Sequence, residues 1–459
     1  MKHIHFIGIC GVGMSALAIL WQKKGWKVTG SDAGFFPPIS THLKKHGIEF
    51  YPGWHPEKMT GQEGSLPDLV VVGNVAASEN PEWKFTLENK IPYVSYPELI
   101  AKNLVKKNSI VCAGTYGKTS TTAILAWILK NANYKPSYMF GGLSLDMEES
   151  ADDLGGDWSI LEGDEYKTSR WDNRAKFFSY QPTRLLLTAT EWDHADIYPT
   201  EKNYFDAFRE LIKIIPENGL IVVSENVPES IIYLSRAKIL KYGKKENCDY
   251  GYSDVKIDKN GIALKITFGN SHFFVSSNVI GEYMAENICG AFALAREIGI
   301  APETIIKSLA DFNGLKRRME KRGKTQSGAD VFDDIAHSPA KAKSVLETLK
   351  KIYNGKIYAI FEPNTGNRQP QSAPQYDYAF AAADEVIIPR LTKIKSSEEQ
   401  KHLNGGELAN IIFRSHSAVK HIEDDDYLIN YIKQKTQPRD AVVFLGSHGF
   451  RGMIEKILD

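Results

Sequence analysis

The run SIVCAGTYGKTSTTAILAWILK, residues 109–130, decides the fold class of this 459-residue chain. Its opening residues form a short apolar stretch that predicts a buried strand, and residues 119–130 carry apolar side chains at helical spacing. The turn between them contains Gly114 and Gly117, and Lys118 follows at the expected start of the helix. A strand, a glycine-bearing turn and a helix in this order are typical of a loop that binds nucleotide phosphates.

The chemistry of this loop indicates a nucleoside triphosphate and a magnesium ion. Backbone amides would surround the phosphates, the Lys118 ammonium would reach the β- and γ-phosphate oxygens, and the Thr119 hydroxyl would bind Mg²⁺. Cys112 stands where the full pattern has its first glycine, so the loop is a variant of that pattern. The residues expected to hold the phosphates are Gly114, Thr115, Gly117, Lys118, Thr119 and Ser120.

The composition fits a folded globular chain of about three domains, at roughly 150 residues each. The 56 basic residues balance 56 acidic ones, and 42% of the chain is apolar. A net charge of zero argues against a protein that wraps nucleic acid or coats an anionic membrane. No apolar run approaches the ~18 residues of a membrane span, no secretion signal is visible, and the cysteines are too few for a disulfide scaffold. These features predict a cytoplasmic protein.

Strand and helix patterns alternate on both sides of the central loop and predict parallel sheets. Over residues 248–277 apolar and polar residues alternate with a period of two, and the Gly269-Asn270 turn within this stretch predicts a β-hairpin. We therefore expect an α/β fold with three domains: a Rossmann-like domain over 1–107, a P-loop ATPase-like domain with the hairpin over 108–322, and a Rossmann-like domain over 323–459. The expected strands are 3–9, 26–29, 68–72, 92–95, 109–113, 158–162, 184–188, 219–224, 263–268, 272–276, 331–334, 356–361, 385–388 and 441–445, and the expected helices are 14–24, 97–106, 119–130, 339–353 and 450–458.

A second glycine loop, Gly8-Ile-Cys-Gly11-Val-Gly13, follows the first expected strand and opens a helix. Its backbone amides could approach a diphosphate at the positive end of that helix. Asp32 follows the second strand, where an acidic side chain commonly reaches a ribose hydroxyl. The glycines do not have the usual spacing, and a tight turn with no ligand is the alternative interpretation.

Two acidic motifs follow other strands of the middle segment. Glu162-Gly-Asp164-Glu165 comes directly after an apolar strand and could hold magnesium, and Asp193-His194 follows the strand 184–188. Both lie at the carboxyl ends of strands, where ligands collect in parallel sheets. Each motif taken alone could equally be a solvated surface loop.

The last segment also has polar residues where its strands end. Asp333 and His337 lie between a strand and a helix, where they could bind a ribose or a substrate amine, or cap the helix. Arg318 and its two basic neighbours could neutralise phosphate charge or belong to an ordinary basic surface. These residues are consistent with a site for a second substrate.

Taken in order, these motifs resemble those of the Mur ligases of peptidoglycan synthesis, and the resemblance covers essentially the whole chain. The form Gly114-Thr-Tyr-Gly117-Lys118-Thr119 is similar to that family's own phosphate loop, although Tyr116 departs from it. The resemblance implies an ATP-dependent ligase that forms amide bonds. Its three domains would bind a UDP-sugar, ATP with Mg²⁺, and an incoming amino compound.

Residues Gly8–Ser15 resemble the diphosphate loop of the branch of this family that accepts UDP-N-acetylmuramate. Members of that branch attach either L-alanine or, in peptidoglycan recycling, the peptide L-alanyl-γ-D-glutamyl-meso-diaminopimelate. Phe361-Glu362-Pro363 and Gly163-Asp164-Glu165-Tyr166 resemble the peptide-using form, so we expect a peptide acceptor and keep L-alanine as the alternative. The residues implied to bind these substrates are Gly8, Gly11, Gly13, Met14, Ser15, Ser31, Asp32, Asn74, Arg368 and Arg451.

The reaction implied by the resemblance passes through an acyl phosphate. The lactyl carboxylate would attack the γ-phosphate of ATP while Lys118 and Mg²⁺ offset the developing charge, and a peptide amine would then displace phosphate. Thr119 and Glu162 would hold one Mg²⁺, and Glu162 and His194 a second. The remaining implied roles are ATP binding by Asn287, Arg318 and Asp333, and a candidate general base in His337.

The implied partners are UDP-N-acetylmuramate and a small peptide, with no nucleic acid and no membrane, and the chain is expected to be a monomer or a weak homo-oligomer. Some Mur ligases carboxylate a lysine near this site, but Phe208 and Arg209 occupy the corresponding region, so we do not expect that modification. A non-catalytic nucleotide-binding regulator is a remote alternative. The intact Lys118, Glu162 and His194 argue against it.

Overall fold

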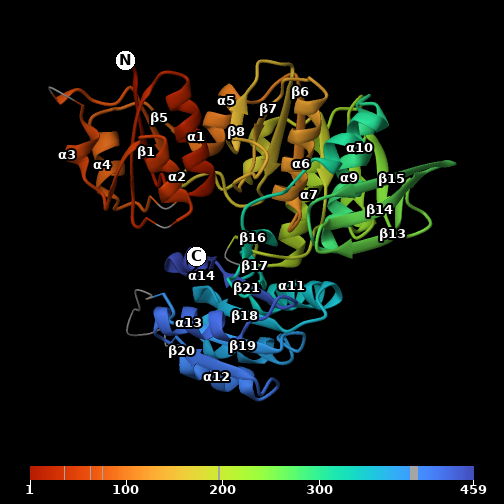
Figure 1. The fold of residues 1–459 in the computed structure, drawn as a ribbon. Coiled ribbons are helices and arrows are strands. Elements are labelled where there is room, and N and C mark those ends of the chain that lie inside the picture. The colour runs from red at the N-terminus through yellow and green to blue at the C-terminus, as the bar shows by residue number, and fades with distance from the viewer. Residues whose placement is uncertain (36, 62–63, 75, 195–196, 393–401, 459) are drawn as a thin grey trace. The chain divides into compact units, whose positions relative to one another are not determined.

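A computed structural model describes residues 1–458 apart from 36, 62–63, 75, 195–196 and 393–401 (Figure 1). The described chain forms two compact units. The first unit comprises residues 1–255, 263–278 and 283–314, and the second comprises 256–262, 279–282 and 315–459. The expected α/β fold with mainly parallel sheets is confirmed.

The N-terminal segment folds as a parallel sheet in the order β3-β2-β1-β4-β5. Its strands are β1 (His3–Ile7), β2 (Lys27–Asp32), β3 (Glu49–Pro52), β4 (Leu69–Val72) and β5 (Tyr93–Ser95), and its helices are α1 (Val12–Lys23), α2 (Ile39–Lys45), α3 (Pro56–Met59), α4 (Pro81–Glu88) and α5 (Tyr96–Asn103). Figure 1 shows α1 and α2 on one side of this sheet and α3 and α4 on the other. The strand expected over 3–9 ends at Ile7 because Gly8 adopts a φ of 92° and turns the chain.

The middle segment forms a sheet of ten strands in the order β15-β14-β13-β12-β11-β10-β6-β9-β7-β8. Its strands are β6 (Asn108–Ala113), β7 (Ser137–Met139), β8 (Ala151–Asp153), β9 (Trp158–Gly163), β10 (Arg184–Leu187), β11 (Leu220–Ser224), β12 (Lys238–Gly243), β13 (Tyr250–Asp258), β14 (Gly261–Phe268) and β15 (Ser271–Ser277). Its helices are α6 (Lys118–Asn131), the 3₁₀ helix η2 (Lys176–Tyr180), α7 (Glu201–Ile214), α8 (Glu229–Ile232), α9 (Tyr283–Glu297) and α10 (Pro302–Ala310). Strands β9, β6, β10, β11 and β12 pair in parallel. The expected hairpin is present as β14 and β15.

Helix α7 is not among the predicted helices, although the sequence carries a signal for it. Its buried residues Tyr204, Phe208, Leu211 and Ile212 recur at helical spacing and form one apolar stripe. This stripe joins an apolar cluster that also contains residues of β10, β11 and α1. The cluster therefore runs through the middle and N-terminal segments, which explains why both belong to one compact unit.

The C-terminal segment forms a sheet in the order β16-β17-β21-β18-β19-β20, parallel except for β16. Its strands are β16 (Glu320–Lys324), β17 (Asp330–Asp334), β18 (Ile357–Glu362), β19 (Glu385–Pro389), β20 (Val419–Ile422) and β21 (Ala441–Gly446). Its helices are α11 (Pro339–Ile352), η3 (Thr365–Arg368), η4 (Pro370–Tyr376), α12 (Gly405–Phe413), α13 (Asp425–Lys435), η5 (Phe450–Gly452) and α14 (Met453–Leu458). The helix expected over 450–458 starts as η5, where Arg451 has a φ of 54°, and becomes regular only at Met453.

The central strands of the C-terminal sheet are buried along their whole length. Every residue of β17, β18 and β21 is buried, because separate apolar clusters cover the two faces of the C-terminal sheet. Within the described ranges, no helix combines the length and the apolar character needed to cross a bilayer. Because the middles of these strands are covered by apolar side chains, polar side chains lie at the strand ends, and residues at these ends form the candidate site.

Candidate active site

The phosphate-type loop lies between β6 and α6, as predicted. Gly117 precedes the helix with a φ of 83°, in the left-handed region that favours glycine. A Cβ at this position would lie 2.7 Å from Oδ1 of Asn287, so the side chain of Asn287 in α9 is packed directly against the loop. Thr115 donates its hydroxyl to the carbonyl of Glu191 at 2.7 Å, and Ser120 is buried in the first turn of α6. The free N–H groups at the start of α6 form a natural anion site.

Glu165 holds the lysine of the loop. The Lys118 Nζ lies 2.9 Å and 3.1 Å from the two carboxylate oxygens of Glu165, and it also donates to the carbonyls of Gly114 and Thr115. Glu165 is almost fully buried, with 1% of its surface exposed. The Nε2 of His194 lies 3.5 Å from the same carboxylate, and this contact raises the pKa of His194 although burial opposes the shift. One carboxylate thus contacts both Lys118, predicted to bind phosphate, and His194, predicted as a Mg²⁺ ligand.

Glu162 faces the hydroxyl of Thr119. Thr119 Oγ1 donates to Glu162 Oε1 at 2.9 Å, and the N–H of Gly141 donates to Oε2 at 2.6 Å. Burial raises the pKa of Glu162, partly offset by the Gly141 hydrogen bond and by the charge of Lys118. A hydroxyl and a carboxylate are the hard oxygen ligands that Mg²⁺ prefers, so these two residues fit the ion that the sequence implies.

A cavity of about 260 Å³ connects Glu162 with the N-terminal glycine loop. Asp164 and Lys176 form an ion pair in its wall. Burial works against the charge of Asp164, but the Lys176 ammonium outweighs it and holds the Asp164 pKa below its ordinary value. The lining residues are Gly8, Gly11, Gly13, Met14, Asp32, Val72, Gly73, Asn74, Tyr96, Gly141, Glu162, Asp164, Thr168, Lys176 and Tyr180.

The predicted substrate residues of the N-terminal segment divide into two groups. Met14, Asp32 and Asn74 line the cavity together with the loop glycines. The Asp32 carboxylate accepts the N–H of Cys10 at 2.9 Å, so it orders the glycine loop itself. Ser15 and Ser31 are buried, where Ser15 donates to the carbonyl of Val12 and Ser31 donates to the buried carboxylate of Glu82. Substrate contacts by these two serines stay a prediction.

In the second unit, a buried arginine organises the ends of β17 and β21. Arg317 lies 3.2 Å from Oδ1 of Asp333 and donates to the carbonyls of residues 446, 447 and 448. Burial raises the pKa of Asp333, and the Arg317 charge opposes that shift. Arg318, which the sequence reading selected, is exposed. Arg317 is therefore the residue that fixes Asp333, and the two basic residues have different environments.

His337 is held in one tautomer. Its Nδ1 lies 2.7 Å from the carbonyl oxygen of Ile335, which can only accept, so Nδ1 carries the proton and Nε2 of the neutral ring has a free lone pair. Burial lowers the pKa of His337, and the charge of Lys341 lowers it further. A neutral imidazole with an available Nε2 has the chemistry of a general base.

The two arginines expected to meet acceptor carboxylates already have partners. Arg368 donates to the carbonyls of Thr392 and Leu403 at 2.8 Å and 3.3 Å. Arg451 forms two hydrogen bonds of 2.9 Å with Asp425 and lies 3.4 Å from the buried Glu362. Their binding of a substrate carboxylate stays a prediction that requires an exchange of partners.

In the first unit, the structure thus brings together Lys118, Thr119, Glu162, His194 and Asn287. In the second unit, Asp333 lies at the end of β17 and His337 directly after that end. From the sequence, Glu165 is only one of three residues in a motif that could hold magnesium, and Arg317 is only one of three basic residues that could neutralise phosphate charge; the contacts that they make in the structure were not predicted. Glu165 lies in the acidic motif that follows β9, so a signal was present, whereas nothing in the sequence distinguishes Arg317 from its neighbour.

The chain matches three protein-family models along its length. "Mur ligase family, catalytic domain" matches residues 3–107, "Mur ligase middle domain" matches 112–295, and "Mur ligase, glutamate ligase domain" matches 317–448.

Similar curated proteins carry two names. The chain is 32% identical to UDP-N-acetylmuramate–L-alanyl-γ-D-glutamyl-meso-2,6-diaminoheptandioate ligase of Escherichia coli, over 99% of this chain and 97% of the relative. It is 31% identical to the ligase of the same name from Haemophilus influenzae, over 100% and 99% of the two chains. It is 29% identical to UDP-N-acetylmuramate–L-alanine ligase of Desulfitobacterium hafniense, over 97% of each chain.

Solved structures give the same picture. The murein peptide ligase of Psychrobacter arcticus aligns with a TM-score of 0.71 and 26% identity, over 100% of this chain and 98% of that one. The UDP-N-acetylmuramate-alanine ligase of Thermotoga maritima aligns with a TM-score of 0.82 at 22% identity over the same shares, which shows a common fold.

Proposed function

Because the chain belongs to the Mur ligase family, we propose that it joins UDP-N-acetylmuramate to L-alanyl-γ-D-glutamyl-meso-diaminopimelate. The bond formed is an amide between the lactyl carboxylate of the sugar nucleotide and the free amine of the peptide. ATP supplies the energy, and the product serves peptidoglycan recycling. We place the reaction in the cytoplasm, where ATP and UDP-sugars are available.

The observation that most strongly supports this proposal is the cavity that runs from the N-terminal glycine loop to Glu162, which accepts a hydrogen bond from Thr119 of the phosphate-type loop. Gly8, Gly11 and Gly13 line it from one side, and Glu162 with its partner Thr119 stands at the other. A sugar nucleotide with its diphosphate at the N-terminal loop would direct its lactyl carboxylate toward the γ-phosphate held by the second loop. The full-length likeness to relatives named for the same donor and peptide agrees with this arrangement.

We assign one substrate to each expected domain. Residues 1–107 bind UDP-N-acetylmuramate, residues 108–322 bind ATP, and residues 323–459 bind the peptide. The matched segments 3–107 and 112–295 lie within the first two ranges, and the segment 317–448 begins six residues before the third range, which supports the division to within a few residues.

In the first chemical step, the lactyl carboxylate oxygen attacks the γ-phosphorus and ADP leaves with the electrons of the broken P–O bond. Lys118 donates hydrogen bonds to the phosphate oxygens, and the loop amides stabilise the charge that develops on them. Glu165 positions the Lys118 ammonium and His194 before the nucleotide binds. Thr119 and Glu162 would hold one Mg²⁺, and Glu162 and His194 a second; when bound, these ions would supply charge neutralisation at the phosphates.

In the second step, the peptide amine attacks the acyl carbon and inorganic phosphate leaves. The amine must lose a proton, and His337 Nε2 is the group we assign to accept it. Asn287, Arg318 and Asp333 would contact ATP. Arg368 and Arg451 would meet the peptide carboxylates after exchanging their present partners.

L-alanine is the second candidate acceptor, and the likeness to the L-alanine ligase of Desulfitobacterium hafniense supports it. A single amino acid carries its carboxylate next to the amine. The end of β18 reads Phe361-Glu362-Pro363-Asn364-Thr365 and lacks the His-Arg pair of the L-alanine ligases that the chain resembles, and the nearby Arg451 is already paired with Asp425 and Glu362. A carboxylate left partly unpaired costs about 1–3 kcal/mol, or roughly 5- to 150-fold in affinity. We therefore expect the peptide to be preferred by that factor.

The test is an assay of Mg²⁺-dependent ADP release that requires UDP-N-acetylmuramate and an amine acceptor. L-alanine and the tripeptide compete in one reaction, and the products are separated by mass. Preferential ligation of L-alanine would overturn the peptide assignment and leave the ligase assignment intact. ADP release that needs no acceptor, or no amide product with either acceptor, would overturn the ligase assignment itself.

A further inference from the structure

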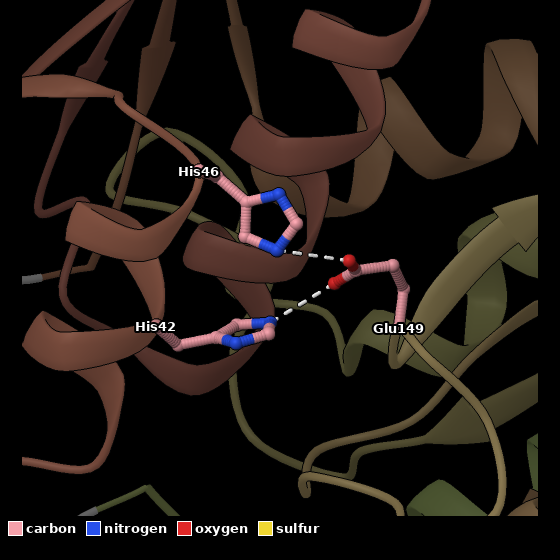
Figure 2. Close-up of side chains that lie close together, drawn as sticks. All are labelled: His42, His46 and Glu149. Atoms are coloured by element: carbon pink, nitrogen blue, oxygen red, sulfur yellow. Dashed lines mark hydrogen bonds and ion pairs between the residues drawn. The ribbon is translucent and has the colours of Figure 1, made fainter.

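A histidine pair and a glutamate meet outside the cavity described above (Figure 2). His42 lies in α2 and His46 is the residue that caps the C-terminal end of that helix. Glu149 lies in the segment that leads into β8 of the middle segment, 103 residues beyond His46 in the chain. All three belong to the first compact unit.

The helix places both imidazoles on one face, because residues four apart are neighbours on a helix surface. Figure 2 shows the two rings pointing at the same carboxylate, each toward a different oxygen. His42 Nε2 lies 2.9 Å from Glu149 Oε2, and His46 Nε2 lies 3.0 Å from Oε1. One ligand atom from each of the three residues lies within 4.8 Å of the others.

The carboxylate of this cluster is buried, the two imidazoles are mostly buried, and within the described part of the chain two of the ligand atoms lack hydrogen bonds. The side chain of Glu149 is 1% exposed, and those of His42 and His46 are 17% and 16% exposed. Among the described contacts, neither His46 Nε2 nor Glu149 Oε1 has a hydrogen-bond partner, although the two atoms lie close to one another. Native proteins rarely leave buried polar atoms unbonded, so a ligand between these atoms would satisfy both.

We propose that His42, His46 and Glu149 form a binding site for a divalent transition-metal ion of the zinc class, which joins α2 to the segment before β8. Two imidazole nitrogens and one carboxylate are a ligand set that such ions use, with a fourth position left for water. Bonds of about 2.0 Å in a tetrahedron separate the ligand atoms by roughly 3.3 Å. The contacts of 2.9 Å and 3.0 Å are near that value and all three ligand atoms lie within 4.8 Å of one another, so the side chains need only close around the ion.

The site differs from the magnesium site in its chemistry and in its place. Mg²⁺ prefers oxygen ligands, which Thr119 and Glu162 offer, whereas this cluster offers two nitrogens. None of its three residues lines the cavity that contains Glu162. The bound ion would stabilise the unit by tying its N-terminal segment to its middle segment, independently of the ligase reaction.

One side chain competes with the ion. The Lys23 Nζ lies 3.4 Å from Glu149 Oε1 and 3.5 Å from Glu148 Oε2. Lys23 is one-third exposed and Glu148 is mostly exposed, so the ammonium can turn from Glu149 toward Glu148 and solvent when a cation arrives. Removing the Lys23 charge should therefore strengthen metal binding.

The test is zinc binding by the full chain, stripped of metal with a chelator and measured by competition with a chromophoric zinc indicator in excess Mg²⁺. We expect one zinc ion per chain and a higher melting temperature when zinc is added. His42→Ala, His46→Ala and Glu149→Gln should each weaken binding by at least about tenfold, since even the loss of an outer partner of a metal ligand costs about 10- to 100-fold. The matched control His272→Ala, at an exposed histidine of β15, should bind zinc as the parent does.

Lys23→Met separates a metal site from a merely structural contact. It should raise the zinc affinity, and damage to folding cannot imitate such a gain. In Co²⁺-loaded protein, the visible absorption of the ion should disappear in His46→Ala and remain in His272→Ala. No zinc binding by the parent chain, or a stoichiometry and affinity unchanged in all three cluster variants, would overturn the proposal.

Discussion

Replacing Lys118 by methionine separates the contribution of its ion pair with Glu165 to stability from its proposed role in binding phosphate. Lys118→Met keeps the length of the side chain, but it leaves the buried Glu165 carboxylate without its main cation. Removing one partner of a buried ion pair costs about 3–5 kcal/mol. His194 still faces Glu165 at 3.5 Å, so we expect the lower end, about 3 kcal/mol. At roughly 2–4 °C per kcal/mol, the melting temperature should fall by about 6–12 °C.

Glu165→Gln provides the second arm of a double-mutant cycle. It leaves the Lys118 ammonium with the carbonyls of Gly114 and Thr115, so its cost should be about 1–2 kcal/mol. In the double variant neither charge stays buried alone, and we expect stability to recover by about 2 kcal/mol relative to the sum of the single changes. Turnover should not recover, because the loss of a donor to transition-state charge costs about 10²- to 10³-fold in either background.

The assays are thermal melting and steady-state ADP release with both substrates present. Lys213→Met is the matched control, since its pair with Glu210 is about half exposed and should contribute less than about 1 kcal/mol. A Lys118→Met variant that melts like the parent would refute the buried ion pair as a source of stability. A double variant that regains turnover would refute the assignment of Lys118 to the phosphates.

Two further predictions concern the site. Glu162→Gln keeps the shape of the side chain and removes its charge, so the Mg²⁺ concentration needed for half-maximal ADP release should rise by about 10- to 100-fold; an unchanged Mg²⁺ titration would contradict the assignment. Burial lowers the pKa of His337, so its neutral, basic form should persist below the ordinary value of about 6.5. In a pH profile of kcat/KM for the acceptor, the rate should fall only as the pH drops through that lowered pKa, and His337→Asn should remove this acid limb; an acid limb above about 6.5, or one retained in the variant, would show that another group is the base.

Local patterns in the sequence were sufficient for the phosphate loop and for many of the central strands. The run 109–130 predicts β6, the loop and α6, and the structure differs by one residue at each end. Buried strands such as β18 and β21 read as continuous apolar runs because both of their faces are covered. Helix α7 was missed although its apolar stripe is regular, and the start of α14 was misplaced because Arg451 breaks the helical backbone.

The partners of the site residues were less predictable. Lys118 and Glu165 are 47 residues apart, and they meet because β6 and β9 are neighbours in the sheet. Three adjacent basic residues, 316–318, look alike in the sequence, but only the middle one turns inward to Asp333. Such choices depend on the sheet order and on which side chain faces the core, and local composition does not encode either.

The sequence by itself determined the fold class, the glycine loops and the residue types available for phosphate and magnesium chemistry. Apolar periodicity and the position of glycines can be read from a short stretch of sequence, because the spacing of apolar residues within one strand or helix shows which of its faces is buried. Only the tertiary structure decided that Glu165 gathers Lys118 and His194, that Arg317 fixes Asp333, and that Glu149 lies against His42 and His46. These contacts join residues far apart in the chain, and their free energy depends on desolvation and distance, which exist only once the chain is folded.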